Sequence, residues 1–288
     1  MALIKKSNDL IQANYNLSLN EQRLIYTLCS TIQRTDKDFE NYEFTLTELA
    51  ELTKIDKKFI YAEIENIALS LSSKPIVFIR EDVGKLICNW CSSFDFNEKI
   101  NTVKICFDPK LKPYLLELKK CFTAYDKKYI EQFKSKYSFR LYELCKQYQS
   151  IKKRKISIVS LKSFLNIENK YHKIAALKAY IINPAIKEIN EHSDLLITTK
   201  YKKTRRSITD IEFTIENKLA NCQSEKQEKM IVDEVNKQEQ TRRTQAEQKN
   251  KTEDRTKIWD AMSDEDKQKN YPGARGFAKF MAGFAKKV

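Results

Sequence analysis

The sequence predicts a helix-rich α+β protein in which one series of elements, namely helix, strand, helix, turn, helix and hairpin, occurs twice. Three observations support this fold class. Glycine is scarce, with 4 in 288 residues, and this composition favours helices. The same order of periodic segments is found in residues 1–120 and in residues 121–217. Residues 44–55 also align with residues 156–167 without a gap, at an offset of 112.

The elements of the first copy follow from its apolar spacing. A capping box at Ser18 and Glu21 opens the first helix. The strand YEFTL leads into a short helix, and a longer helix ends before Pro75. Three predicted strands and a closing helix follow: IVFIRE (76–81), KLICNWCSSFDF (85–96), NTVKICFD (101–108) and PKLKPYLLELKK (109–120).

The second copy repeats this order. Its predicted elements are an amphipathic helix, a basic strand, a short helix and a long helix: KYSFRLYELCKQYQ (136–149), KKRKISIV (152–159), SLKSFLNI (160–167) and HKIAALKAYIINPAIKEINEH (172–192). The ungapped alignment pairs apolar residues: Phe44 with Ile156, Leu46 with Ile158, Leu49 with Leu161, Leu52 with Phe164 and Ile55 with Ile167. A hairpin over 195–215 completes the unit. We therefore expect two tandem winged-helix domains, over residues 1–120 and 121–217, with this hairpin as a wing.

Residues 218–288 have a different character. They are polar and charged, and one brief apolar cluster cannot sustain a coiled coil, so we expect a partly helical or disordered tail. Near its end, aromatic and apolar residues recur at helical spacing: Phe277, Phe280, Met281 and Phe284. This short amphipathic stretch is expected to dock onto a partner or fold back on Trp259. One short helix with two glycines would anchor poorly to lipid.

Most of the net charge of +14 lies in one stretch of the chain. Residues 150–206 carry a net charge of +10, whereas residues 1–149 carry +3. Such a patch favours a polyanion, either nucleic acid or an anionic membrane surface, because a surface that only confers solubility intersperses both signs. We expect double-stranded DNA, because the charge falls on a winged helix.

The tip of the hairpin is expected to bind DNA phosphates. It concentrates five basic residues with no acidic residue among them: Lys200, Lys202, Lys203, Arg205 and Arg206. Such cations repel one another until they reach a DNA backbone, where each phosphate contact releases condensed counterions. The alternative is an ordinary solvated turn.

The long helix is expected to read the major groove. At 100° per residue, its apolar residues gather on one side and a mixed set of polar and small residues falls opposite: His172, Lys173, Ala176, Tyr180, Asn183 and Lys187. Hydrogen-bonding and cationic groups beside a small residue suit base edges and phosphates. The alternative is an ordinary solvated face. Pro184 is expected to kink the helix, and Lys178 lies on the apolar side.

The corresponding helix of the first copy is expected to contact DNA more weakly. It exposes Lys57, Lys58 and Tyr61, but also Glu63 and Glu65, and acidic groups facing DNA reduce affinity. This copy is therefore either the weaker DNA reader or a protein-contact surface.

Catalysis, metal binding and cofactors have little support. The only two histidines, His172 and His192, are twenty residues apart, and the few glycines form no phosphate-binding loop. Cys88 and Cys91 suggest zinc or redox chemistry, but residues three apart in a strand point to opposite faces and no second pair completes a site. Buried, reduced thiols are the simpler interpretation. With no signal peptide and no long apolar run, we expect a cytoplasmic protein without membrane contact.

Three segments resemble one protein family. SKYSFRLYELCKQY (135–148) resembles the Ser-Lys-Tyr-x-x-Arg-Leu-Tyr-Glu-Leu signature of the plasmid replication initiators of the Rep_3 superfamily. PAIKEINEHSDL (184–195), with the basic turn and ITDIEFTI after it, resembles the second winged helix of that family. NLSLNEQRLIYTL (16–28) resembles its opening helix. The resemblance covers about residues 8–217, in order.

The resemblance implies a protein that binds direct repeats, called iterons, at a plasmid origin, opens nearby AT-rich DNA and recruits host replication proteins. It also implies a homodimer in equilibrium with a monomer, formed through the first domain. Base reading is carried over to the outward residues of 172–187, and phosphate contacts to 200–206. The signature residues Tyr137, Arg140, Tyr142 and Glu143 are more simply explained as structural, in a helix that bridges the domains.

Three functional classes remain open. The first is a replication initiator without an active site, and the second is a transcriptional repressor with the same tandem winged helices. The third, a nicking enzyme, is remote because the closely spaced histidines of rolling-circle initiators are missing. Direct repeats at about two helical turns beside AT-rich DNA would indicate an origin, whereas a lone palindrome would indicate an operator.

Overall fold

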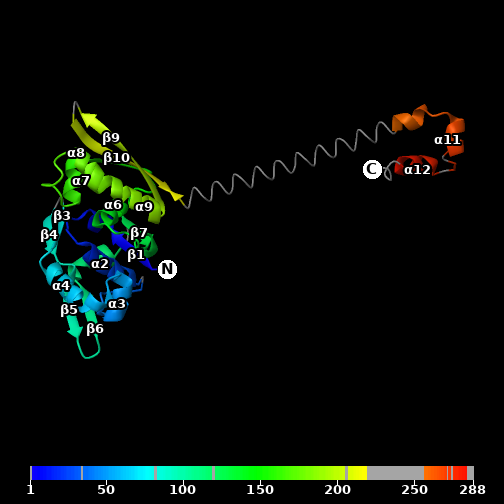
Figure 1. The fold of residues 1–288 in the computed structure, drawn as a ribbon. Helices are drawn as coiled ribbons and strands as arrows, with labels where there is room; N and C mark the ends of the chain where they lie inside the picture. The colour runs from blue at the N-terminus through cyan, green and yellow to red at the C-terminus, as the bar shows by residue number, and fades with distance from the viewer. Residues whose placement is uncertain are drawn as a thin grey trace. The chain divides into compact units, whose positions relative to one another are not determined.

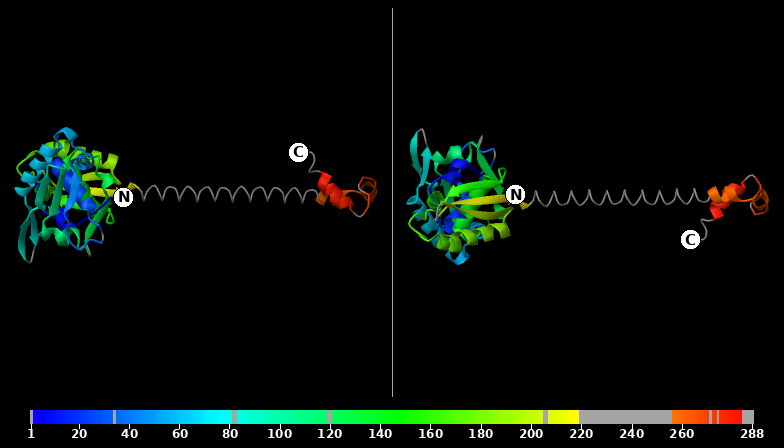
Figure 2. Two further views of the ribbon diagram at one scale, coloured as in Figure 1. Left: turned by 90° about the horizontal axis from the view of Figure 1, so that it is seen from below. Right: turned by 90° about the horizontal axis from the view of Figure 1, so that it is seen from above.

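The computed structural model describes residues 2–33, 35–80, 83–118, 121–204, 207–218, 256–270, 272–273 and 275–283. These residues fall in two compact units, Met1–Leu219 and Ala220–Val288, each described by itself. The first unit contains both copies of the predicted series of elements (Figures 1 and 2). Each copy has its own three-stranded antiparallel sheet, with strand orders β2-β6-β5 and β8-β10-β9.

The first copy is built from short helices around a three-stranded sheet, with an additional hairpin. Its elements are α2 (Leu19–Thr31), β2 (Tyr42–Thr45), α3 (Leu46–Thr53), η1 (Lys57–Phe59), α4 (Ile60–Ser72), β3 (Ile76–Arg80), β4 (Gly84–Cys88), β5 (Cys91–Asn97), β6 (Thr102–Phe107), η2 (Pro109–Leu111) and α5 (Lys112–Leu115). The predicted capping box of Ser18 and Glu21 starts α2, and a second one, of Thr45 and Glu48, starts α3.

The stretch KLICNWCSSFDF, residues 85–96, is not the single strand that its apolar pattern predicted. β4 pairs with β3 in a separate hairpin, whereas β5 pairs with β6. The break falls at Trp90, which is fully buried with its ring edge-on to Tyr15. Asp108 fixes the break, because its carboxylate accepts from the N–H of Asn89 and its N–H donates to the carbonyl of Trp90.

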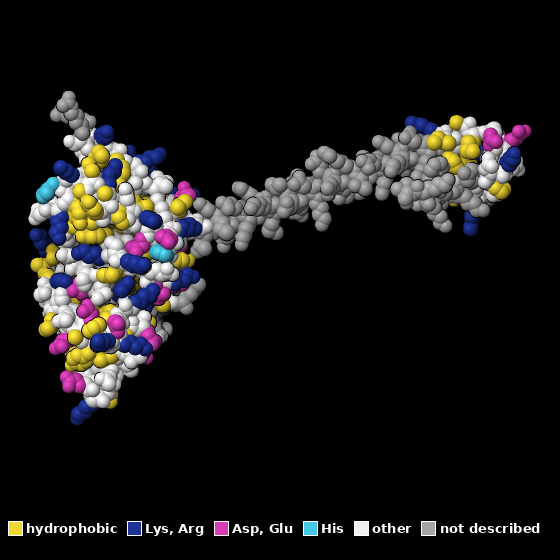
Figure 3. Space-filling model, viewed as in Figure 1, with side chains coloured by type: hydrophobic (Ala, Val, Ile, Leu, Met, Phe, Trp, Pro, Cys, Tyr) yellow, Lys and Arg dark blue, Asp and Glu magenta, His cyan; other side chains and the backbone are white. Residues whose placement is uncertain are grey.

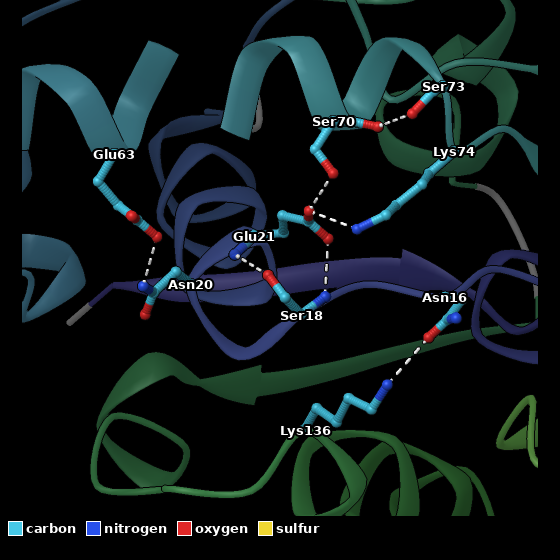
Figure 4. A network of polar contacts seen from close by, with 9 residues as sticks. All are labelled: Asn16, Ser18, Asn20, Glu21, Glu63, Ser70, Ser73, Lys74 and Lys136. Atoms are coloured by element: carbon cyan, nitrogen blue, oxygen red, sulfur yellow. Dashed lines mark hydrogen bonds and ion pairs between the residues drawn. The ribbon is translucent and has the colours of Figure 1, made fainter. Parts of the chain in front are cut away.

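A buried carboxylate ties α2 to the end of α4 (Figure 4). Glu21 accepts hydrogen bonds from the backbone N–H of Ser18 at 2.7 Å and from the hydroxyl of Ser70 at 2.7 Å. Its side chain, only 4% exposed, also forms an ion pair with Lys74 at 2.6 Å. Burial alone would raise the pKa of Glu21, but these partners outweigh it and hold the pKa below its usual value.

The second copy follows the first at the predicted offset. Its elements are α6 (Lys136–Lys146), β8 (Lys153–Ser157), α7 (Ile158–Phe164), α8 (Ile174–Leu177), η4 (Lys178–Ile182), α9 (Asn183–His192), β9 (Leu195–Thr204) and β10 (Ser207–Asn217). The junction of β2 and α3 at Thr45 corresponds to the junction of β8 and α7 at Ser157, and both residues cap the helix that follows. The internal repeat predicted from residues 44–55 and 156–167 is therefore confirmed.

Helix α6 bridges the two copies. The guanidinium of Arg140 donates to the carbonyls of Ile11 and Ala13, in and after α1 (Asn8–Gln12), and to the carbonyl of Phe164 at the end of α7. It is stacked between the rings of Tyr15 and Phe164, 3.8 and 3.9 Å from their centroids. Because these partners come from both copies, the structural role predicted for the signature helix is confirmed.

A second buried contact of α6 involves β1 (Leu3–Ser7), which pairs with β7 (Phe122–Asp126) just before η3 (Lys127–Tyr129). Lys6 and Glu143 form an ion pair at 2.9 Å with both side chains 1% exposed. Tyr26 and Tyr125 donate their hydroxyl protons to the same carboxylate. Burial would lower the pKa of Lys6, but the charge and hydrogen bond of Glu143, together with Tyr15 and Cys29, outweigh it and raise the pKa. Nearby, Asp194 accepts from Tyr142 and forms an ion pair with Lys146.

The second unit contains the short helices α11 (Asp264–Asn270) and α12 (Gly276–Gly283). The ring of Trp259 lies 5.4 Å from that of Phe277 and 5.3 Å from that of Phe280. Of the two alternatives for the amphipathic end, the structure shows Phe277 and Phe280 folded back on Trp259. The part of the tail over 219–255, and the end of the chain from residue 284, lie outside the described residues.

Candidate nucleic-acid interface

The long helix of the second copy, α8–η4–α9, presents the predicted two faces. Leu177, Ile181, Ile182, Ala185 and Ile189 are buried, and α9 packs against α6 and β9. The opposite face is solvent-accessible: His172, Lys173, Tyr180, Asn183 and Lys187 are exposed and Ala176 is partly so. The helix begins at Ile174, so His172 and Lys173 lie in the turn that precedes it.

Pro184 widens the helix rather than breaking it. Because proline has no N–H and its ring crowds the carbonyl four residues earlier, an unbroken α-helix cannot continue through it. The chain adopts a π-helical turn over η4, in which the N–H of Asn183 donates to the carbonyl of Lys178. α9 then continues with Pro184 in its first turn. The predicted kink is therefore a widened turn, placed where Tyr180 is exposed.

Lys178 joins this helix to the wing. Its ammonium lies 3.5 Å from the centroid of the Tyr201 ring on β9. A cation over a tyrosine face is attracted by the ring quadrupole, and the contact accounts for a lysine on the apolar side of the helix. Burial raises the pKa of Tyr201. The widened turn therefore contacts the wing at Tyr201, in the half of β9 nearer to the tip.

The wing is a long antiparallel hairpin that extends from the second copy (Figure 1). Alternate residues along one face of the hairpin are buried or half-buried: Leu195, Ile197, Thr199, Tyr201, Ile211, Phe213 and Ile215. Lys200, Lys202 and Lys203 are exposed, as predicted. Arg205 and Arg206 lie outside the described residues, so their assignment to phosphates stays a prediction. Figure 3 shows Lys and Arg side chains bordering hydrophobic side chains over α7 and α8.

The wing carries acidic partners that the sequence reasoning missed. Glu212 on β10 forms ion pairs with Lys202 at 3.0 Å and with Lys153 at 3.1 Å, and Asp210 pairs with Lys155 at 3.5 Å. The alternation of β10 predicts that Asp210 and Glu212 lie on the face opposite to Ile211 and Phe213. Only the cross-strand register reveals which lysines they meet.

The first copy exposes its three predicted residues, and acidic side chains contact two of them. Lys57, Lys58 and Tyr61 are exposed at the start of α4. Lys57 forms an ion pair with Glu51 at 2.8 Å, and Tyr61 donates its hydroxyl proton to Glu98 at 3.0 Å. The weaker contact with DNA expected of the first copy stays a prediction.

Cys88 and Cys91 lie on two different strands, and not on the single strand that the sequence predicted. Cys88 ends β4 and Cys91 begins β5, on either side of buried Trp90. Burial raises the pKa of Cys88 to about 11 and raises that of Cys91 as well, so both thiols stay protonated. Among the described residues, no three metal-ligating side chains lie close enough together to hold a metal ion.

None of the described helices is long and apolar enough to cross a membrane.

The fold and this surface define the class of protein: a chain of two tandem winged helices with a basic second wing. Residues 3–146 match the family model described as "Initiator Replication protein, WH1". Residues 157–215 match the one described as "Initiator Rep protein, WH2". The chain therefore belongs to the Rep3 family of initiator replication proteins.

Two proteins of Escherichia coli are similar in sequence. A replication initiation protein is 26% identical over 245 residues, which make up 81% of this chain and 77% of that protein. An uncharacterized 27.6 kDa protein is 23% identical over 209 residues, covering 67% of this chain and 87% of its own length.

One solved structure is similar over most of its length. The crystal structure of the Pi initiator protein in complex with iteron DNA matches with a TM-score of 0.63 and 20% sequence identity. The match covers 74% of this chain and 96% of that one. At this identity the likeness shows the fold alone. The fold class predicted from the sequence, α+β with two winged helices, is confirmed.

Proposed function

We propose that this chain is a plasmid replication initiator that binds direct repeats in double-stranded DNA at an origin. The observation that carries the proposal is the exposed face of α8–η4–α9 beside a lysine-rich wing. A helix with hydrogen-bonding groups outward suits the major groove, and a basic hairpin beside it suits the flanking phosphates. The Pi initiator protein, a relative in fold, was crystallised in complex with iteron DNA.

Within this surface, one set of residues recognises bases and a second set binds phosphates. His172, Lys173, Ala176, Tyr180, Asn183 and Lys187 form the reading face, where an amide such as that of Asn183 can pair with both edge groups of an adenine. Lys200, Lys202, Lys203, Arg205 and Arg206 hold phosphates, which supply affinity without sequence information. Lys57, Lys58 and Tyr61 of the first copy add weaker contacts.

A homodimer in equilibrium with the monomer is part of the proposal, formed through the first copy. The hairpin of β3 and β4 supports it, because Ile79 and Ile87 are 72% and 62% exposed, and Val83 at its turn is 73% exposed. A two-stranded hairpin with exposed apolar side chains is suited to contact with a second chain. Such a dimer would also serve the alternative function, repression of transcription at a palindrome.

Origin opening, without cutting, is the activity that we propose for the bound protein. Bending across several repeats costs about 1–6 kcal/mol per site, which multivalent contacts offset, and host replication proteins then enter the open AT-rich segment. Nicking by histidine-bound metal is disfavoured, since His172 precedes α8 and His192 ends α9, about 30 Å apart along the helix. No cofactor enters this scheme.

The test uses supercoiled plasmid carrying the DNA that flanks the gene. We expect protection of direct repeats spaced by about two helical turns, and reactivity of adjacent AT-rich DNA to single-strand probes when host factors are added. The plasmid should stay covalently closed in the presence of Mg²⁺. Protection of a lone palindrome would indicate a repressor, and a relaxed product with protein linked to a 5′ end would indicate a nicking enzyme.

A further inference from the structure

The outward face of the second copy's sheet alternates acids and lysines across three strands. In the register of the sheet, Glu212 on the central strand β10 lies directly between Lys155 on β8 and Lys200 on β9. Residues directly opposite in an antiparallel pair share a face, as do residues two positions along. Glu212 is therefore surrounded by four lysines of one face: Lys153, Lys155, Lys200 and Lys202.

Burial separates the acid from the lysines. The Glu212 side chain is only 8% exposed, whereas those of Lys153 and Lys202 are 59% and 51% exposed. The two ammonium groups lie 3.1 and 3.0 Å from separate oxygens of the carboxylate. Hydrogen bonds from Lys202 and Lys153 hold the pKa of Glu212 below its usual value, so the carboxylate stays charged at neutral pH. A polyanion that approaches this face meets the lysines and not the acid.

We propose that Glu212 acts as an intramolecular counterion of the wing. When DNA binds, its phosphates displace the Glu212 carboxylate from Lys153 and Lys202. In the free protein, the single negative charge of Glu212 is shared between Lys153 and Lys202 and offsets one of their two positive charges, which would otherwise attract any DNA backbone. On binding, phosphate must compete with Glu212 for both ammonium groups. Glu212 therefore lowers the affinity of the chain for DNA in general, and it reduces the number of counterions that binding releases. This inference rests on the proposed function, because it assumes that the wing meets DNA.

The neighbouring lysines provide a matched comparison. Lys202 and Lys203 are adjacent and exposed on β9, but Lys203 forms no ion pair with any residue that the structure describes. If Glu212 restrains only its partners, its removal should change what Lys202 contributes to binding and leave the contribution of Lys203 unchanged.

The experiment measures binding of the full chain to a random-sequence duplex and to a duplex with the direct repeats, over a series of salt concentrations. E212Q keeps the size of the side chain and removes its charge. E216Q, four residues along the same strand and on the same face, removes one charge from a carboxylate whose partner position on β9 is Leu196 and not a lysine. For E212Q we expect about tenfold tighter binding to both duplexes and a salt dependence steeper by about one, because one negative charge is removed. E216Q should show a much smaller change.

A double-mutant cycle separates this role from a merely structural one. K202M should weaken binding more in the E212Q background than in the wild type, whereas K203M should weaken it equally in both. Thermal unfolding shows whether each variant is folded. If E212Q binds no more tightly than E216Q, or if K202M has the same effect in both backgrounds, the inference is wrong. If the wild type binds both duplexes equally, the proposed function fails, and the comparison on the random duplex still decides the role of Glu212.

Discussion

At the scale of single residues, Arg140 has the largest predicted effect on stability. Its guanidinium donates to three backbone carbonyls from both copies and is stacked between two rings. R140K keeps the charge but cannot satisfy three carbonyls or stack in the same way. We expect a loss of about 2–3 kcal/mol in the free energy of unfolding, measured by chemical denaturation. The same change at exposed Arg80 should have little effect; equal losses at both positions would contradict this role.

Glu21 is expected to make stability depend on pH. Its pKa is lower in the folded chain than in the unfolded chain, so the folded state binds fewer protons and acid favours unfolding. Its contribution is complete above the unfolded pKa and is lost as the pH falls through the folded pKa. E21Q should cost about 1–2 kcal/mol at pH 7 and almost nothing at strongly acidic pH. Denaturation curves across this range check the result, with E65Q on the exposed face of α4 as the control.

The sequence predicts which residues are exposed where helical periodicity decides it, and it does not predict contacts that depend on strand register. The exposed face of 172–187 follows from helical spacing and was predicted. The pairing of Glu212 with Lys153 and Lys202 depends on how β8 and β9 align with β10, and no local pattern encodes that alignment. The contact between Lys178 and Tyr201 similarly joins two elements that spacing treats separately.

At the scale of elements, the two copies are expected to contribute unequally to DNA binding. Lys57 is paired with Glu51 and Tyr61 with Glu98, whereas Lys200 and Lys203 have no ion pair among the described residues. Replacing Lys57 and Lys58 by Met should therefore weaken binding less than replacing Lys200 and Lys203. Gel shifts at one fixed salt concentration compare the two double variants. Equal losses of affinity would show that the lysines of the first copy contribute as much to DNA binding as those of the second.

Element boundaries show where prediction from sequence ends. The offset of 112 located both strand–helix junctions, since Thr45 and Ser157 carry local capping signals. The break of residues 85–96 into β4 and β5 has no such signal. It depends on Asp108, nineteen residues from Asn89, and on burial of Trp90. Pro184 predicts an irregular helix, but no sequence signal specifies that the irregularity is a π-helical turn over Lys178–Ile182.

At the scale of the whole molecule, the C-terminal unit is expected to be separable from DNA binding. The family matches end at residue 215, and the contacts of Trp259 described above are with Phe277 and Phe280. W259A should remove the aromatic core of this unit while leaving the affinity for direct repeats within about threefold of the wild type. Fluorescence anisotropy with labelled duplex measures the affinity. A loss of tenfold or more would assign the tail a part in binding DNA.

The most direct measurement of the central claim is the salt dependence of binding for two variants of the full chain, one of each proposed role. A variant with Tyr180 and Asn183 replaced by Ala should lose preference for the direct repeats while its salt dependence stays that of the wild type. A variant with Lys200 and Lys203 replaced by Met should bind repeats and random DNA more weakly by a similar factor, with a slope lower by about one per lost phosphate contact. If the lysine variant loses sequence preference and the helix variant loses salt dependence, the roles of helix and wing are the reverse of those proposed.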